Sequence, residues 1–205
     1  MEKNIQELGG HLSNQSTVST SLDSIDVDGL NVELAENVEW LSKIVNDDNT
    51  QDISEKIISI SNSGSKLIGT FYESKCILSN KFYLSKDKNN IPELLSVINL
   101  GSNIESHPNV VHGGFSATIV DNCFGILAHQ IFKFPVTKTL NLSYKNPIQP
   151  NSTIIVISKL KDTENGESPI KGNRATLVSE IYDINRKLLI SSEAIFVDIS
   201  DRMKK

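Results

Sequence analysis

Apolar residues recur at helical spacing in an early stretch of the chain. Between residues 30 and 45 they lie three or four positions apart, with polar side chains between them: Leu30, Leu34, Val38, Leu41 and Val45, accompanied by Trp40 and Ile44. This pattern is the stripe of an amphipathic helix. A second, shorter helical stretch is expected from Ile53 to Ile60.

The strongest helical segment of the sequence runs from Gly113 to Phe132. It is apolar almost all round, which predicts a helix buried within the domain. Pro135 follows, so the helix has ended by that point. Asp121, in the middle of this segment, is the exception to its apolar character.

Most of the remaining chain predicts strands. Runs rich in β-branched and aromatic residues at Lys66–Glu73 and Cys76–Leu84 are expected to form a hairpin. In the segment Thr137–Lys145, polar residues at odd positions alternate with Leu140, Leu142 and Tyr144, which predicts a strand with two unlike faces. The other expected strands are Leu94–Leu100, Ser152–Leu160, Arg174–Ile184 and Leu188–Val197, and the last four strands are expected to form a meander.

These elements predict an α+β fold in which an antiparallel sheet wraps around one long central helix. One buried helix among so many strands is covered most economically by the sheet itself. We expect three parts: a polar tail over residues 1–29, an N-terminal helical extension over 30–62, and the folded domain over 63–200. The tail is too polar to bury enough apolar surface to offset its ordering entropy.

Composition narrows the functional classes. The 205 residues carry a net charge of −5 without a basic cluster, which argues against binding to nucleic acid or to an anionic membrane surface. The two cysteines, Cys76 and Cys123, provide neither a disulfide framework nor a metal-ligand spacing. There is no apolar run long enough to span a membrane. The first ten residues resemble neither a secretory signal nor an import presequence, so a cytoplasmic or mitochondrial location is expected.

The chemistry-bearing segment lies at the start of the long helix. Gly113 and Gly114 allow a ligand close to the backbone, and the first helical turn offers N–H groups that have no partner within the helix. A polarised carbonyl or an oxyanion suits such a position. His112 precedes the turn and can position the loop or the ligand. Asp121 places a carboxylate on an otherwise apolar helix, where an idle charge would be costly.

The spacing of these groups predicts a dimer. Asp121 follows Gly114 by seven residues, which is about 10 Å along a helix axis. One helix therefore cannot bring both its N-terminus and its own Asp121 to one reacting carbon. Two antiparallel copies can do so, which predicts a homodimer with two equivalent shared sites, alone or as a dimer of dimers.

The sequence resembles the hotdog-fold acyl-coenzyme A thioesterases over about residues 66–198. The resemblance depends on His112-Gly113-Gly114, on Asp121 nine positions after the histidine, on Gly125, and on the Leu-Asn-Leu-Ser-Tyr-Lys-Asn-Pro run that ends at Pro147. Mitochondrial-type members of the thioesterase superfamily and their fungal relatives are most similar.

The resemblance implies a catalytic role for each matched residue. Asp121 would act as general base or nucleophile on the thioester. The N–H of Gly113 or Gly114 would form the oxyanion hole, Thr137 would orient the attacking water, and His112 would have a structural and polarising role.

The resemblance also implies an acyl-coenzyme A substrate, with coenzyme A as part of the substrate, no separate cofactor and no metal. Phe115, Ile119 and Phe124 are expected to line an apolar slot for the acyl group. Cations are needed for the coenzyme A phosphates. The complete set of candidate substrate-binding residues is Asn109, Val111, Phe115, Asn122, Lys145, Lys171 and Arg174.

Two other functions remain open at this stage. A hydratase or dehydratase of acyl thioesters could use the same fold, and His107-Pro108 is a partial match to the loop of that group. A non-catalytic acyl-thioester-binding scaffold is the other alternative, because the tail and the extension would suit a partner-binding role. Asp121 alone could also be a structural helix aspartate, and Cys123 is expected to be a small core residue.

Overall fold

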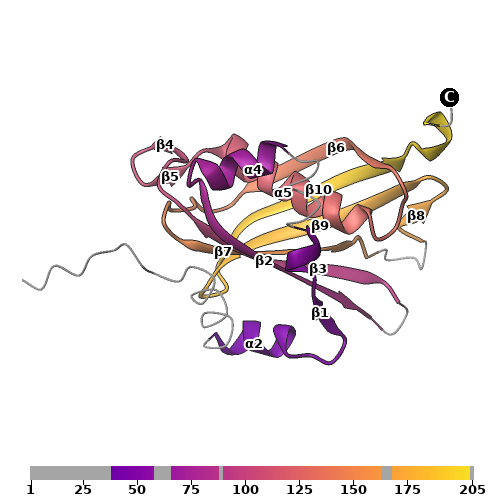
Figure 1. Cartoon of the computed structure of the whole chain (residues 1–205), viewed down its shortest axis with the longest axis horizontal. Helices are drawn as coiled ribbons and strands as arrows, with labels where there is room; N and C mark the ends of the chain where they lie inside the picture. The colour runs from indigo at the N-terminus through magenta and orange to yellow at the C-terminus, as the bar shows by residue number, and fades with distance from the viewer. Residues whose placement is uncertain (1–37, 58–65, 88–89, 163–167, 204–205) are drawn as a thin grey trace, which may run out of the picture.

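The computed structural model describes residues 38–57, 66–87, 90–162 and 168–203 (Figure 1). Its helices are α2 (Glu39–Val45), α4 (Lys66–Glu73), α5 (Gly113–Ala128) and the 3-10 helix η1 (Ser200–Arg202). Its strands are β1 (Thr50–Asp52), β2 (Ile77–Lys86), β3 (Pro92–Leu100), β4 (Glu105–His107), β5 (Val110–Val111), β6 (Pro135–Tyr144), β7 (Thr153–Leu160), β8 (Ile170–Lys171), β9 (Arg174–Asp183) and β10 (Leu188–Asp198).

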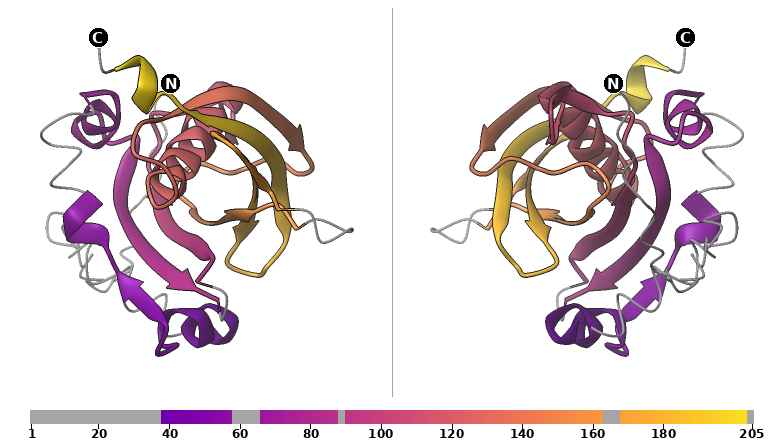
Figure 2. Two further views of the ribbon diagram at one scale, coloured as in Figure 1. Left: turned by 90° about the vertical axis from the view of Figure 1, so that its right-hand side faces the viewer. Right: turned by 90° about the vertical axis from the view of Figure 1, so that its left-hand side faces the viewer.

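One antiparallel sheet dominates the described residues. Its strand order is β1-β2-β3-β7-β9-β10-β6, with β8 paired to β9, and β4 and β5 form a separate ribbon. Seen from its ends, the sheet curls around α5, and α2 lies outside the curl (Figure 2). The expected α+β class, with a sheet wrapped around a central helix, is confirmed.

Helix α5 packs one face against the concave side of the sheet. The buried positions of the helix follow helical spacing, and apart from Ser116 they join the main core: Ser116, Ile119, Val120, Cys123, Phe124, Leu127 and Ala128. The opposite face of the helix is only partly covered and includes Thr118, Asp121 and Asn122. The helix ends at Ala128, four residues earlier than predicted, with His129 as its C-cap. Within the described ranges, no helix has the length and apolar character needed to cross a bilayer.

Strand β3 is buried on both of its faces. Leu94 and Ile98 belong to the core around α5, whereas Leu95 and Val97 point to the other side of the sheet. There they form a second cluster with Leu41 of α2. This arrangement explains the almost continuous apolar run of β3, because a strand covered on both faces does not need polar alternation.

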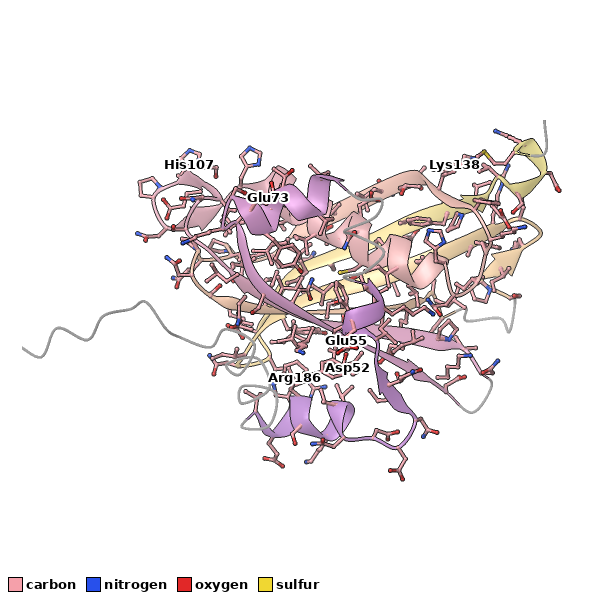
Figure 3. All side chains as sticks on the ribbon, in the orientation of Figure 1. Asp52, Glu55, Glu73, His107, Lys138 and Arg186 are labelled. Atoms are coloured by element: carbon pink, nitrogen blue, oxygen red, sulfur yellow. The ribbon has the colours of Figure 1, made fainter. Side chains whose placement is uncertain are left out.

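The N-terminal helix therefore adds an outer layer to the sheet. Helix α2 covers the outer face of β2, β3 and β7. Trp40 anchors it, since its Nε1 donates to the Ile184 carbonyl at 3.2 Å and the Arg186 guanidinium lies 5.4 Å from its ring centre (Figure 3). Residues 1–37, which include the expected tail and the first turns of the expected helix, lie outside the described residues.

The prediction of a strand at Lys66–Glu73 was wrong, and with it the expected hairpin. The segment forms helix α4, which buries Ile68 and packs Phe71 and Tyr72 on the core, a spacing of three and four residues. Its β-branched and aromatic content suggested a strand, but its apolar spacing is helical. Strand β2 pairs instead with β3 on one side and with β1 on the other. Of the helix predicted over Ile53–Ile60, residues 54–57 are helical and 58–60 are not described.

The expected meander of the last four strands also needs correction. β7, β9 and β10 are consecutive neighbours, but β6 lies beyond β10 at the far edge of the sheet. The connection from β6 to β7 therefore passes the two strands that lie between them, β10 and β9. The crossing leaves one long edge of β6 without a paired strand among the described residues.

We predict that Leu41→Ala lowers the free energy of unfolding by about 2–5 kcal/mol, because Leu41 is fully buried between α2 and the sheet. The matched control is Leu67→Ala, whose leucine is 57% exposed and whose loss should change stability by no more than about 0.5 kcal/mol. Urea denaturation measures both. Equal effects of the two substitutions would mean that α2 is not a packed layer.

Candidate functional site

The histidine at the start of α5 caps the helix. His112 has extended backbone angles (φ −60°, ψ 128°), and its Nδ1 accepts a hydrogen bond from the Gly114 N–H at 2.9 Å. An accepting Nδ1 carries no proton, so the neutral ring has its proton on Nε2. The Gly114 N–H is therefore already used by the protein itself.

The first peptide of the helix is held at both ends. Tyr144, at the end of β6, donates its hydroxyl proton to the Gly113 carbonyl at 2.8 Å, while His112 holds the N–H of the same Gly113–Gly114 peptide. A Cβ on Gly113 would lie 3.3 Å from the Tyr144 oxygen, so a larger residue here would require the tyrosine to shift by a few tenths of an ångström. Within the part of the chain that the structure describes, the Gly113 N–H has no hydrogen-bond partner.

A hollow of about 360 Å³ opens beside this peptide. Its lining comes from the β4–β5 ribbon, the start of α5 and the end of β6, and includes Val111, Gly113, Tyr144 and Lys145. Val111 is buried and also donates its N–H to the Ile148 carbonyl. Of the three candidate cations, Lys145 is the one next to the helix start.

Asp121 lies on the less covered face of α5 and is half-buried. The Thr137 hydroxyl donates to its Oδ1 at 2.7 Å, so the structure joins two residues that are 16 positions apart. A carboxylate with one oxygen held by a hydroxyl keeps its other oxygen for a further partner. The same hydrogen bond also fits the structural alternative for this residue, a helix aspartate satisfied by a neighbouring hydroxyl.

A β-bulge turns Thr137 toward the helix. β6 pairs Thr139 with Ile195 and Thr137 with Phe196, which leaves Lys138 as an extra residue between them. Bulges of this kind reverse the alternation of faces along a strand. Thr137 consequently faces α5, together with the even-numbered Leu140 and Leu142 further along the strand. The strict odd-even alternation that the sequence predicted fails at this one residue.

A groove of about 830 Å³ runs along α5 beside Asp121. The helix forms its floor with Asp121, Asn122, Gly125, Ile126 and His129. The start of β6, including Thr137, forms one wall, and residues from β1, the turn at 54–57 and β2 form the other. The groove shares no residue with the hollow at Gly113. Within one protomer the carboxylate and the free N–H therefore open into different cavities.

The other predicted substrate-binding residues lie apart from one another. Asn109 is exposed in a left-handed turn (φ 61°) and donates its N–H to Glu105. The Phe115 ring packs on Phe71 of α4, with 5.0 Å between ring centres. Lys171 and Arg174 line a separate cavity of about 530 Å³ near Glu193, and of the predicted set only Asn122 lies beside Asp121.

The expected apolar slot is not formed by Ile119 and Phe124. Both side chains are buried in the core between α5 and the sheet and line neither cavity of the site. A further groove of about 860 Å³, between α2 and the ends of β2, β3 and β7, contains none of the predicted site residues.

Neither a cysteine nucleophile nor a metal site has support in the described residues. Complete burial raises the pKa of the Cys123 thiol to about 12, which keeps it protonated. Among the described ranges, no three His, Cys, Asp or Glu side chains gather closely enough to hold a metal ion. His107 lies at the exposed tip of β4, hydrogen-bonded to Ser106, and lines neither the Gly113 hollow nor the Asp121 groove (Figure 3).

Two contributions to the site were missed in the sequence. The alternation along β6 places Tyr144 on the same face as Leu140 and Leu142, so the sequence alone could have indicated that it faces the helix. Its hydrogen bond to Gly113 depends on the register of the folded strand. Ile53 and Ile57 line the groove beside Asp121, and their spacing of four residues was visible only as a short helix.

Comparisons with known proteins agree with this architecture. The sequence model of the thioesterase superfamily matches residues 108–165, which include the glycine pair and Asp121. The chain is 31% identical over 87 residues to an uncharacterized mitochondrial protein of Candida albicans (strain WO-1), covering 42% of this chain and 39% of that protein. It is 29% identical over 119 residues to acyl-coenzyme A thioesterase THEM4 of Mus musculus, covering 58% and 46%. Both matches span less than half of the relative's length.

Solved structures of low sequence identity share the fold. Thioesterase superfamily member 2 of Mus musculus matches with a TM-score of 0.52 and 13% identity, over 71% of this chain and 96% of that one. The E. coli PaaI protein from the phenylacetic acid degradation operon matches with a TM-score of 0.52 and 10% identity, over 72% and 96%. These matches confirm the hotdog fold, and the family model over residues 108–165 agrees with the resemblance to thioesterases that the sequence indicated.

We predict that His112→Ala lowers the free energy of unfolding by about 1 kcal/mol, because the Gly114 N–H loses its capping acceptor. His112→Asn should restore most of the loss, since asparagine is a preferred N-cap. His129→Ala, at the exposed C-terminal end of the same helix, is the control and should have little effect. Urea denaturation of the three variants checks this, and equal stability of the parent and His112→Ala would contradict the cap.

Proposed function

We propose that this hotdog-fold chain, which matches the thioesterase superfamily, hydrolyses an acyl-coenzyme A thioester to the free acid and coenzyme A. The observation that carries the proposal is the hydrogen bond between Thr137 and Asp121, a carboxylate on the uncovered face of α5 beside a large groove. Family resemblance supports thioester hydrolysis as the reaction class. The roles of the individual residues and the identity of the substrate as an acyl-coenzyme A are what we propose.

In the proposed reaction, water adds to the thioester carbon. Thr137 occupies Oδ1 of Asp121, and the other carboxylate oxygen takes a proton from water as the new C–O bond forms. The C–S bond then breaks, and the sulfur leaves as the thiol after receiving that proton. Direct attack by Asp121, with hydrolysis of the resulting anhydride, remains the other form of the same chemistry.

The Gly113 N–H is the proposed oxyanion donor. Of the two glycine N–H groups, that of Gly114 is held by His112, whereas that of Gly113 has no partner among the described residues. It lies in the first turn of α5, where the helix dipole also favours negative charge. A preorganised donor of this kind typically lowers the barrier by about 3 kcal/mol. His112 and Tyr144 act by fixing the peptide plane beside it.

Each site is proposed to form between two subunits. Asp121 and Gly113 are eight residues apart on one straight helix, about 12 Å along its axis, and they open into different cavities. The outer edge of β6 has no paired strand among the described residues, and such an edge is suited to pairing with a second copy. An antiparallel arrangement would bring Asp121 toward Gly113 of the partner subunit.

Two further features bear on the substrate and the compartment. Lys145, beside Gly113, is the best-situated cation for a coenzyme A phosphate, whereas Lys171 and Arg174 would need a ligand that reaches a second cavity. The name of the Candida relative supports a mitochondrial location over a cytoplasmic one for this chain as well.

We predict that Asp121→Asn reduces thiol release from acyl-coenzyme A substrates by roughly 10²- to 10⁴-fold, because asparagine cannot take a proton from water. The oligomeric state, measured by light scattering, should remain that of the parent. Asp48→Asn, which neutralises an exposed turn residue, is the matched control and should keep full activity.

Three outcomes would count against this assignment. Equal thiol release by Asp121→Asn and the parent would refute the role of Asp121. Hydration of an enoyl-coenzyme A without thiol release would favour a hydratase. Tight acyl-coenzyme A binding without turnover, unchanged in Asp121→Asn, would favour a scaffold.

We predict that two inactive variants complement one another. Gly113→Pro removes the proposed N–H at the first helical position, where proline is tolerated, and His112 already has the extended backbone that precedes proline. This variant should lose roughly 10²- to 10³-fold in kcat. Gly113→Ala is its control, since it retains the N–H but adds the same Cβ near Tyr144.

Co-expressed in equal amounts, Gly113→Pro and Asp121→Asn should recover about a quarter of the parent activity. Half of the randomly assorted dimers are mixed, and each mixed dimer has one intact shared site out of two. Thiol release from the purified mixture measures the recovery. No recovery, despite mixed dimers detected by two affinity tags, would place each site within a single subunit.

A further inference from the structure

The groove beside Asp121 has a wall that does not come from the helix or from β6. Residues of the N-terminal extension and the strand next to it form this wall: Gln51, Ile53, Lys56, Ile57, Leu84 and Lys86. Opposite them lie the start of β6 and Phe196 of β10. The groove thus lies over α5 between the two edges of the curled sheet, and the extension forms its β2 side.

The extension is fixed to the sheet at this point. β1 pairs with Tyr83–Ser85 of β2, the Ile53 N–H donates to the Phe82 carbonyl at 2.9 Å, and the Phe82 N–H donates to the Ser54 hydroxyl at 2.9 Å. Asp52 accepts the Ser54 N–H at 2.8 Å (Figure 3). The wall is therefore part of the folded sheet and not a separate flap.

The helical turn at 54–57 then sets the direction of two isoleucines. The Ile57 N–H donates to the Ile53 carbonyl at 3.1 Å, which places Ile57 one turn beyond Ile53 on the same side. Ile53 is buried in the main core, and Ile57 packs against that core while remaining partly exposed. Ile57 is therefore, with Leu84, an apolar member of the wall that a ligand in the groove would touch.

The groove contains apolar surface from all of its sides, and eight of its sixteen lining residues are polar or charged. Ile53, Ile57, Leu84, Ile126, Val136 and Phe196 supply the apolar surface. Asp121 and Thr137 supply the reacting end in the function proposed above, on which this inference depends. A ligand that reacts at Asp121 and continues along the groove therefore needs an apolar tail, and its volume of about 830 Å³ is in the range of small-molecule sites.

In the function proposed above this groove takes the acyl chain, and we propose that Ile57 on the N-terminal extension determines which acyl-chain lengths are accepted. The occupant is an apolar acyl chain attached through its thioester carbon beside Asp121. The extension thereby has a part in substrate selection that Phe115, Ile119 and Phe124, the residues expected from the sequence, do not have.

The experiment compares two substitutions at Ile57 with the same substitutions at Ile44. Ile57→Trp fills the groove and Ile57→Ala enlarges it. Ile44 is also half-buried, but it belongs to α2 on the outer face of the sheet. Saturated acyl-coenzyme A substrates of 2, 4, 8, 12 and 16 carbons are assayed for thiol release, and thermal melting checks that each variant is folded.

For the parent, KM should fall by about fourfold for each added methylene until the groove is full. Ile57→Trp should lower kcat/KM for the best parent substrate, relative to acetyl-coenzyme A, by at least about tenfold. Ile57→Ala should move the preferred chain length upward. Both Ile44 variants should keep the parent profile.

If both Ile57 variants keep the chain-length profile of the parent, the inference about Ile57 is wrong, but the proposed hydrolase function stands. The same holds if the variants lose activity equally toward all substrates. If Ile57→Trp does not fold, the shift expected of Ile57→Ala decides alone.

If the parent releases no thiol from any substrate, the proposed function fails and binding decides the inference. Titration calorimetry with dodecanoate should then show binding by the parent that is weakened about tenfold by Ile57→Trp. Absence of binding by the parent would overturn the acyl site as well.

Discussion

The burial of one face of α5 by the curled sheet is the constraint on which the rest of the structure depends. The sheet takes the large apolar side chains of the helix and leaves the face with Thr118, Asp121 and Asn122 less covered. A charge on the covered face would require desolvation without a partner. The wrapping therefore decides where a carboxylate on this helix can be kept ionised and within reach of a ligand.

The same helix fixes the distance between its two chemical groups. A straight helix cannot bend its first turn back to its middle, so the N–H of Gly113 and the carboxylate of Asp121 remain about 12 Å apart along the axis. Accordingly, Gly113 and Asp121 line two different cavities. In the proposed reaction, symmetric pairing of two subunits is the economical way for this rigid helix to supply both groups to one carbon.

Sequence patterns predicted the helices and strands in which the apolar residues follow one clear spacing, either helical or alternating. The glycine-opened helix and most strands were predictable because their apolar spacing is unambiguous, and the register of Asp121 with Gly113 follows from helix geometry alone. Lys66–Glu73 was not predictable in the same way, since its residues favour strands while their spacing favours a helix. The position of β6 at the sheet edge depends on long-range pairing, which local periodicity does not contain.

The approach of Thr137 to Asp121 shows most clearly what a pattern omits. Alternation along β6 assigns Thr137 to the face of Thr139 and Asn141, away from the helix. The bulge at Lys138 reverses that assignment, and it arises where the pairing of β6 with β10 shifts by one residue. Family resemblance indicated a role for Thr137, but the hydrogen bond itself depends on this single extra residue.

The N-terminal extension both covers the outer face of the sheet and lines the groove beside Asp121. Its helix α2 covers the outer face of β2, β3 and β7 through Leu41, and its residues 50–57 reach the other side of the same sheet edge to line the groove beside Asp121. β1 joins the two by pairing with β2. Because the groove wall is built on a strand that α2 helps to bury, the shape of the groove and the stability of the sheet are coupled through one continuous segment.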